Sequence, residues 1–400
     1  MDTKITRALL ERALADNSGI LPLEPTWVAR LVAPPGKRLN LPDHAYDAGE
    51  RGAIAERWLA SCTKAENPVG PPDEGLSYLA LEGPSRVSLV DALAAAGPDI
   101  LGEAFAAKHN TLGYLAKLFD YADRLPYHFH PMGQHMAMIG KLPKDEAYYF
   151  VEGADLGPHP ETFFGVHPYI AEEKKYDLLL PYLVDWNSNL ILQHSRAYQQ
   201  VAGEGFHLPA GIPHAPGTAL TIELQEESDV GVVLQAVNAG QQLPKMRLSR
   251  HVPPEGWAKG GERYILEEMV DWDLSGDPYF YENRHMAPRL RSQQPGGEEY
   301  WIFYNTTKFS GKKMIVKPGQ TFSSQDKGAY GLFVVQGRGT YGGHAVEGKK
   351  PGSDELLVSF DRATKPLDVK NTGDEDLIII KFFGPDVNPD APSIERRRAR

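Results

Sequence analysis

The residues best suited to chemistry are concentrated between positions 128 and 153, in HFHPMGQHMAMIGKLPKDEAYYFVEG. His128 and His130 are two residues apart, and because side chains alternate along a strand, a strand here directs both imidazoles to one face. Glu146 precedes the next apolar run, and His214 follows the Pro- and Gly-containing turn of LPAGIPHA. Three imidazoles and one carboxylate suit a first-row divalent metal, with positions left open for water or substrate. The sequence therefore predicts a metal site formed by these four residues.

Short β-strands are the elements that must position these ligands. The chain has 39 Gly and 32 Pro, an excess that fits many short strands joined by turns. Apolar or alternating runs bounded by turn residues begin at residue 145 and resume after a turn-rich stretch at 240–298. The second region holds six such runs, at the spacing of an antiparallel sandwich or barrel. We predict a mainly β protein with two tandem β-barrels.

Helices are expected mostly outside these strands. Helical patterns occur in an N-terminal segment that ends near Gly19, and at residues 89–96, 102–109 and 172–183. The segment YLAKLFDYADRLPYHFHP (114–131) is interpreted as a strand or short helix that leads into a strand. The expected organisation is therefore a first β domain with helical segments, followed by a second β domain.

Composition restricts the partners and the compartment. Acidic residues outnumber basic ones by 53 to 42, so the net charge of −11 repels nucleic acid and anionic lipid. The N-terminal segment carries charges throughout and lacks the apolar core of a signal peptide, and no apolar run approaches the roughly 18 residues of a membrane span. The single Cys62 excludes an internal disulfide framework. We expect a cytoplasmic protein that binds neither nucleic acid nor membranes.

Four motifs, in order, resemble those of the type I phosphomannose isomerases, a family of the cupin superfamily. AERWLAS (55–61) resembles the Glu-x-Trp segment of that family, and LGYLAKLFDYADRLPYHFHP resembles its Lys-containing strand that leads to Gln-x-His-Pro. KDEAYYFVEG resembles Lys-x-Glu-x-Trp/Tyr-Tyr. GEGFHLPAGIPHAPGTALTIELQEESD resembles both Pro-Ala-Gly-x-Pro-His-Ala and Glu-x-Gln-x-x-Ser-Asp. The similarity covers most of the first 240 residues, and the second β region is similar to the family's C-terminal cupin domain.

The resemblance implies a fold, an activity and a set of site residues. It implies two tandem cupin domains, which are jelly-roll β-barrels: a catalytic domain over residues 1–270 and a second domain over 271–400. It implies a metal-dependent isomerase that interconverts an aldose and a ketose through an enediolate, with Zn²⁺ as the metal and a carbohydrate as substrate. Its implied metal ligands are His128, His130, Glu146 and His214, and its implied catalytic residues are Lys117, Lys144 and Glu223. Glu56 matches a residue that lines the family's pocket.

Two further histidines are candidates for substrate binding. His135 lies close in sequence to the predicted ligands, and His285 lies in the Arg-flanked segment ENRHMAPR. We therefore expect both side chains to line the same pocket as Glu56.

Two positions depart from the family pattern. His128 stands where the family has Gln as its first ligand, and three His with one Glu is also the ligand set of cupin oxygenases and decarboxylases that use Fe²⁺ or Mn²⁺. Val233 stands where the family has its catalytic Arg, and an aliphatic side chain can neither donate hydrogen bonds nor carry charge. Such an oxygenase or decarboxylase, and a sugar-binding module without catalysis, are therefore the alternative functions. A phosphorylated substrate would need another arginine, for which the candidates are Arg196, Arg247, Arg284 and Arg289.

The second β region lacks the residues of a metal site. SSQDKGAY (323–330) stands where a metal-binding cupin would show its paired histidines. We therefore predict a metal-free second barrel that supports the first and can form an interface, for which a homodimer is the expected assembly.

Overall fold

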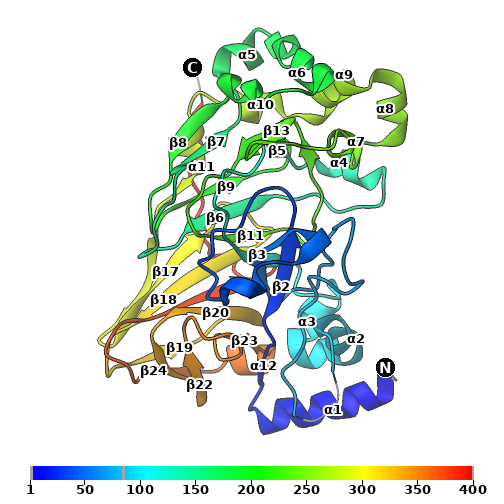
Figure 1. Ribbon diagram of the computed structural model, residues 1–400. Coiled ribbons are helices and arrows are strands. Elements are labelled where there is room, and N and C mark those ends of the chain that lie inside the picture. The colour runs from blue at the N-terminus through cyan, green and yellow to red at the C-terminus, as the bar shows by residue number, and fades with distance from the viewer. Residues whose placement is uncertain (1–2, 83–85, 399–400) are drawn as a thin grey trace.

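The computed structural model describes residues 3–82 and 86–398. Two β-structures lie one above the other along its long axis (Figure 1). A group of short helices covers the end beyond the first β-structure, and the N-terminal helix lies at the opposite end. The predicted mainly β class is thereby confirmed. None of the helices in these residues is both long and apolar enough to cross a membrane.

The first barrel consists of two facing antiparallel sheets. In spatial order, its seven-stranded sheet contains β15 (His285–Met286), β9 (Gly205–Leu208), β6 (Glu146–Phe150), β11 (Thr221–Gln225), β4 (Leu115–Phe119), β3 (Ala53–Leu59) and β2 (Thr26–Arg30). Its five-stranded sheet contains β12 (Val232–Val233), β5 (His128–Phe129), β10 (His214–Ala215), β7 (Glu161–Phe164) and β8 (Arg196–Gln199). Beside it, β13 (Val237–Asn238) pairs with β14 (Gln241–Gln242). Aromatic side chains that include Tyr148, Phe150 and Phe164 fill the core of this barrel.

The second barrel has the same two-sheet construction. In spatial order, its seven-stranded sheet contains β1 (Ile20–Pro22), β23 (Glu355–Val358), β20 (Tyr330–Gln336), β25 (Leu377–Phe383), β18 (Ser310–Val316), β17 (Gly297–Phe303) and β16 (Arg289–Gln294). The other sheet contains β19 (Thr321–Ser324), β24 (Leu367–Asn371), β21 (Arg338–Tyr341) and β22 (His344–Glu347). A separate core that includes Met314, Val334 and Ile379 lies between them.

A further apolar core lies between the two seven-stranded sheets and joins the barrels. Because side chains alternate, Tyr148 and Phe150 of β6 enter the first barrel while Tyr149 enters the shared core with Phe303 and Phe382. Strands covered on both faces are apolar almost throughout, which explains why β4 and β6 read as continuous buried runs. The junction of the barrels is therefore a buried apolar core, as each interior is.

Short helices surround the barrels. Those near the second barrel are α1 (Thr3–Asp16), α2 (Leu89–Leu101), α3 (Glu103–Ala106) and α12 (Phe360–Ala363). Those near the first barrel are α4 (Gly133–Ala137), α5 (Pro168–Glu172), α6 (Leu180–Asp185), α7 (Met246–Ser249), α8 (Pro254–Gly260), α9 (Glu262–Tyr264), α10 (Trp272–Ser275) and α11 (Phe280–Arg284). We call α5 to α10 the helical cap; a core of its own, which includes Ile170, Leu183 and Leu266, joins it to the barrel.

Helix lengths differ from the sequence predictions. The helix predicted at 89–96 begins where expected, because the Ser88 side chain accepts a hydrogen bond from the Asp91 amide, and it breaks at Ala96, whose backbone is not helical; a second helical segment then continues to Leu101. The helix predicted at 172–183 is split among α5, a 3₁₀ turn and α6, and the turn-rich stretch at 240–298 contains helices α7 to α11. Each of these helices spans seven residues or fewer, which is too short for a 3.6-residue period to show.

Strands are exchanged across the predicted domain boundary at residues 270 and 271. β1, from the N-terminal region, pairs with β23 of the second barrel, and β15, from beyond the boundary, pairs with β9 of the first. Arg57 of β3 adds an ionic contact, because its guanidinium donates to Asp354 at 2.7 Å and to Glu355 at 2.9 Å. The sequence predicts two consecutive domains, but each barrel includes one strand from the other side of the predicted boundary.

Candidate metal centre and active site

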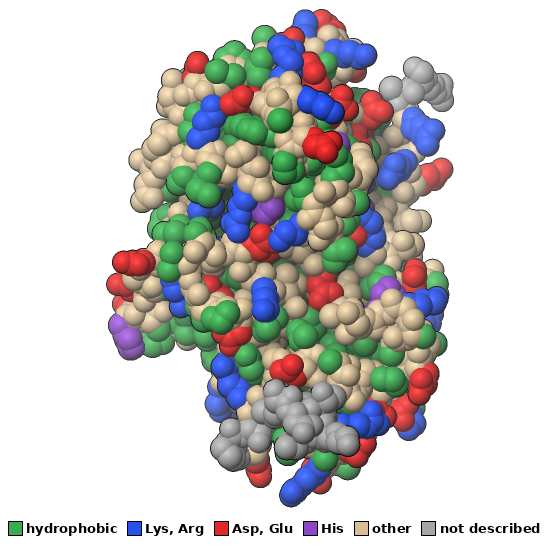
Figure 2. Space-filling view, turned by 90° about the vertical axis from the view of Figure 1, so that its right-hand side faces the viewer, with side chains coloured by type: hydrophobic (Ala, Val, Ile, Leu, Met, Phe, Trp, Pro, Cys, Tyr) green, Lys and Arg blue, Asp and Glu red, His purple; other side chains and the backbone are tan. Residues whose placement is uncertain are grey.

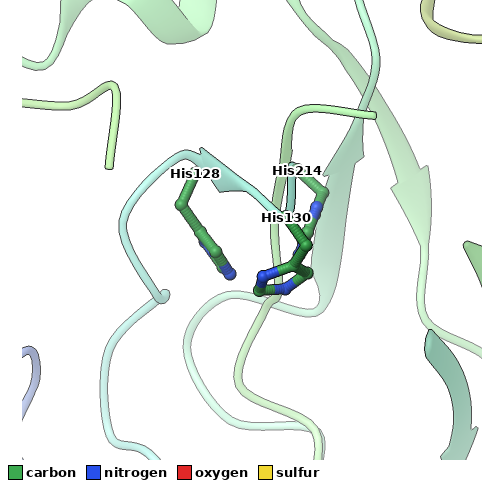
Figure 3. A group of neighbouring side chains, drawn as sticks. All are labelled: His128, His130 and His214. Carbon is green, nitrogen blue, oxygen red and sulfur yellow. The ribbon is translucent and has the colours of Figure 1, made fainter. Parts of the chain in front are cut away.

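Three histidines converge inside the first barrel, as the sequence predicts. His128 of β5 pairs directly with His214 of β10, and His130 follows β5 on the same face (Figure 3). The Nδ1 atoms donate hydrogen bonds to the backbone carbonyls of Pro126, Val230 and Ile212 at 2.7, 2.7 and 2.8 Å, respectively. Since each Nδ1 carries the hydrogen, each Nε2 presents its lone pair. Ligand atoms of the three rings lie within 4.8 Å of one another.

Glu146 of β6 reaches this histidine cluster from the opposite sheet. Its Oε1 lies 2.7 Å from His130 Nε2, and its Oε2 lies 3.2 Å from His214 Nε2. The Tyr148 hydroxyl donates to Oε2 at 2.5 Å and fixes the orientation of the carboxylate. The four residues predicted as metal ligands therefore come together, with Glu146 beside two of the three imidazoles.

The protonation states of His128, His130 and Glu146 suit a divalent metal. Burial lowers the pKa of His128 well below its ordinary value and that of His130 to about 3, so both rings are neutral. The Nε2 atom of His214 is buried, and no hydrogen-bond donor in the described residues reaches it. His130 and Lys144 hold the pKa of Glu146 well below its usual range, although burial opposes this shift. Neutral imidazoles with a carboxylate are the state that binds metal, so these residues fit the ion that the sequence predicts.

The residues predicted to be catalytic lie beside the cluster. The Lys144 ammonium is 2.6 Å from Glu146 Oε1 and 3.6 Å from Glu223 Oε1. Lys117 of β4 lies opposite Glu223 of β11 in the sheet, with 3.3 Å between its Nζ and Oε1. Burial and the Glu146 carboxylate raise the pKa of Glu223 to about 8, although Lys117 and Lys144 oppose this shift. A carboxyl group in this state can exchange a proton near neutral pH.

Glu56, predicted to bind substrate, lines the same cavity but its carboxylate is fully engaged. Arg30 donates to it at 3.1 Å, the Trp58 indole at 2.8 Å and the Tyr121 hydroxyl at 2.6 Å. Arg30 in turn pairs with Asp229 at 2.9 Å. Glu56 therefore stabilises the wall of the cavity and leaves little capacity for a ligand.

Most of these groups line one cavity of about 420 Å³, whereas His214 lies behind its lining. Lys117, His128, His130, Lys144, Glu146 and Glu223 line its interior, and four arginines also line it: Arg30, Arg51, Arg247 and Arg250. Lys and Arg side chains also gather below the helical cap on one face of the molecule (Figure 2). A volume of this size accommodates a small polar ligand such as a sugar.

One of the four arginines considered from the sequence reaches the cavity. Arg247 of α7 lines it, together with Val233 of β12, against which α7 packs. Arg196 instead donates to the carbonyls of Ser275 and Asp277 at 3.0 and 2.6 Å. Arg284 and Arg289 also lie outside the cavity lining. Sequence analysis missed Arg30, Arg51 and Arg250, because no motif links these distant positions to the histidines.

His135 and His285 do not line this cavity, contrary to the sequence prediction. His135 of α4 faces the helical cap, with its Nε2 2.8 Å from the Glu268 carbonyl. His285 lies on β15, at the edge of the seven-stranded sheet, where its Nε2 is 2.6 Å from Glu204 and its ring stacks on Tyr281. Closeness in sequence and flanking arginines therefore failed as signals for this pocket, since both rings are held by other partners.

No family model and no curated protein sequence matches this chain. Solved structures match it closely in shape. Mannose 6-phosphate isomerase from Bacillus subtilis has 17% identity and a TM-score of 0.64, covering 91% of this chain and 99% of its own. A variant of phosphomannose isomerase from Salmonella typhimurium has 14% identity and a TM-score of 0.62, covering 92% and 100%. A zinc-bound mannose 6-phosphate isomerase has 15% identity and a TM-score of 0.60, covering 92% and 100%.

The chain has the mannose 6-phosphate isomerase fold. The match extends over both barrels, so the similarity is not restricted to the motif-bearing first half. It confirms the cupin architecture that the motifs implied. At identities of 14–17% it establishes the fold, and the activity must be argued from the residues in the cavity.

Proposed function

We propose that this protein is a metal-dependent isomerase that interconverts an aldose and a ketose. The observation that supports this most directly is the cluster of three imidazoles and Glu146, with Lys117, Lys144 and Glu223 beside it. Moving a proton between two carbons beside a carbonyl needs an electrophile and an acid–base group within reach of one substrate. The residues that would hold the electrophile lie within a few ångströms of the acid–base candidates.

Each residue has a definable role in this reaction. His128, His130, Glu146 and His214 would hold the divalent metal, which when bound polarises the carbonyl of the sugar. Glu223 takes the proton from the carbon next to the carbonyl and returns it to the neighbouring carbon. The ammonium groups of Lys117 and Lys144 stabilise the negative charge that develops on the substrate oxygens.

Replacing Glu223 by Gln tests the acid–base role. The amide keeps the shape of the side chain but cannot accept a proton, so turnover should fall about 10²- to 10⁴-fold while metal content stays unchanged. Turnover is measured with a panel of aldoses, ketoses and their phosphates. The matched control is Glu227→Gln, which removes a carboxyl group outside the cavity lining and should keep full activity. An active Glu223→Gln enzyme would transfer the acid–base role to a lysine.

Arg247 is the residue that would recognise a phosphorylated sugar. No hydrogen bond from its guanidinium to any part of the described chain is present, whereas Arg30, Arg51 and Arg250 donate to Asp229, Glu74 and the Glu66 carbonyl, respectively. A free guanidinium in a cavity suits a phosphate dianion. Arg247 supplies the positive charge that Val233 lacks, because α7 packs on β12 and places Arg247 in the same cavity lining as Val233.

Arg247→Met should therefore raise KM for a sugar phosphate. Loss of a hydrogen bond to a charged group costs about 1.5–3 kcal/mol, which corresponds to roughly 10- to 150-fold. KM for the unphosphorylated sugar should not change, and kcat should change little. Arg263→Met is the control, since Arg263 lies on the outer face of the helical cap, paired with Asp177 and Glu267. An equal rise in KM for both sugars would mean that Arg247 supports the fold and does not bind the phosphate.

A second candidate function follows from the third imidazole. His128 completes a set of three His and one Glu that also suits Fe²⁺ or Mn²⁺ in an oxygenase or decarboxylase. Stoichiometric iron in protein purified without added metal, with oxygen uptake or release of carbon dioxide, would favour that chemistry. Zinc with sugar isomerisation would favour the isomerase, and thermal stabilisation by sugars without turnover would indicate a binding module.

A further inference from the structure

A buried arginine lies at the junction of the two barrels without an acceptor. Arg284, the last residue of α11, has only 1% of its surface exposed. Its Nε and Nη1 atoms are buried, and no acceptor in the described parts of the chain binds them. Because a buried guanidinium without a partner is strongly unfavourable, an acceptor that is not part of the described chain is needed here.

A second donor without a partner in the described residues lies near Arg284. β15 pairs with β9 through His285 and Phe206, so Arg284 and His207 are the next residues along the two chain segments beyond this pair. His207 is buried, and no described residue forms a hydrogen bond with its Nε2. Its neighbours Phe206 and Leu208 enter the core of the first barrel, so its ring faces the second barrel.

The tautomer of His207 makes its Nε2 a donor. Asn305, which follows β17, accepts a hydrogen bond from the Ile394 amide at its Oδ1, so its amide nitrogen faces His207 Nδ1 at 3.3 Å. Nδ1 therefore accepts, and the hydrogen lies on Nε2. Burial lowers the pKa of His207 well below its ordinary value, and the positive charges of Arg284, Lys308 and Arg396 lower it further. The ring is therefore neutral.

The acidic groups around this site are already engaged. Asp277 accepts from Asn283 and from the Tyr279 amide, each at 2.8 Å. Asp271 accepts from the Leu274 amide at 2.9 Å. Asp145 is bound by Lys308 at 3.0 Å and by the Ala210 amide. None of these three carboxylates forms an ion pair with Arg284 within the described residues.

The C-terminal segment covers the site. Its backbone is tied down by hydrogen bonds from the Arg397 amide to Asn283 and from the Ile394 amide to Asn305. The backbone carbonyl of Arg397 also accepts from Asn283. A ligand at Arg284 would thus be enclosed by β9, α11 and the tail, which restricts it to a small one.

We propose that Arg284 and His207 bind a small inorganic anion, such as chloride, at the junction of the two barrels. The anion accepts hydrogen bonds from Nε and Nη1 of Arg284 and from Nε2 of His207, and it neutralises the buried guanidinium. Its binding stabilises the contact between α11 and the C-terminal tail. This site is separate from the proposed active site and does not depend on the proposed isomerase reaction.

Bromide is the probe for this site, because it resembles chloride and scatters anomalously. The full-length protein is dialysed into chloride-free sodium gluconate, and sodium bromide is then exchanged for gluconate at constant ionic strength. We expect a saturable rise in Tm, since an anion that binds only the folded state stabilises it. Crystals grown in bromide should show an anomalous peak between Arg284 Nε and His207 Nε2.

Variants connect the response to the site. Arg284→Met and, as a milder change, His207→Phe should abolish the rise in Tm with bromide. Arg196→Met is the matched control: it removes a guanidinium that has its own acceptors, Ser275 and Asp277, and it should retain the rise. An ordered water at Arg284 with no anomalous peak, or an unchanged bromide response in both site variants, would overturn the proposal. If Tm rises with phosphate but not with bromide, the site binds an oxyanion and not a halide such as chloride, and the proposal is overturned.

Discussion

His130→Ala should lose its metal and its activity while the first barrel stays folded. His130 contributes one of four donors and is hydrogen-bonded to the Val230 carbonyl, so alanine removes a ligand that the fold holds in place. Changes to residues that only orient ligands cost about 10- to 100-fold in metal affinity, and loss of a ligand should cost at least about 100-fold. The barrel core is apolar and aromatic and includes none of the four ligands, so the fold should not depend on metal.

Elemental analysis after dialysis, circular dichroism and turnover measure the three parts of this expectation. The control is His135→Ala, five residues along the chain, whose ring faces the helical cap and does not line the cavity. That variant should keep stoichiometric metal and near-normal turnover. If dialysed His130→Ala retained stoichiometric metal, the ligand set proposed here would be incorrect.

The convergence of the proposed ligands was predictable because local periodicity and motif spacing carried the information. The two-residue spacing of His128 and His130 fixes their common face in any strand, and the turn before His214 places that ring at the start of β10. Glu146 begins a continuous apolar run, which is the pattern of a strand covered on both faces. These features are properties of short segments and need no knowledge of the remaining chain.

Features set by distant contacts were not predictable in this way. Arg247 reaches the cavity only because α7, a four-residue helix without visible periodicity, packs against β12. β1 pairs with β23, which lies more than 300 residues further along the chain. His135 and His285 show the reverse error, since local context suggested a role that the tertiary structure assigns to other partners.

Lys381→Met should strongly destabilise the second barrel. In its interior the Lys381 ammonium lies 2.7 Å from Glu299, 2.8 Å from Asp326 and 2.6 Å from the Ser324 hydroxyl, and Lys312 lies 2.6 Å from Asp326. Two lysines and two carboxylates thus occupy the region where the sequence lacks paired histidines. Removing one cation leaves buried carboxylate charge uncompensated, which typically costs about 3–5 kcal/mol.

Urea unfolding at neutral pH measures this loss as a decrease in the free energy of unfolding. Lys317→Met is the control, because Lys317 pairs with Asp376 at 2.9 Å on the surface, and it should change stability by no more than about 0.5 kcal/mol. A loss of stability in Lys381→Met as small as that of the control would mean that the buried cluster is not a net source of stability.

Acidification should narrow the difference between wild type and Lys381→Met. In the wild type, Lys381 and Lys312 hold the pKa of Asp326 below its ordinary value despite burial. Its contribution is therefore complete above about pH 4 and is lost as the pH falls through the lowered pKa. In the variant the partly uncompensated carboxylate takes up a proton at a higher pH, and a neutral carboxyl group needs no cation. The penalty should thus be largest at neutral pH and should shrink on acidification, whereas a purely steric defect would be independent of pH.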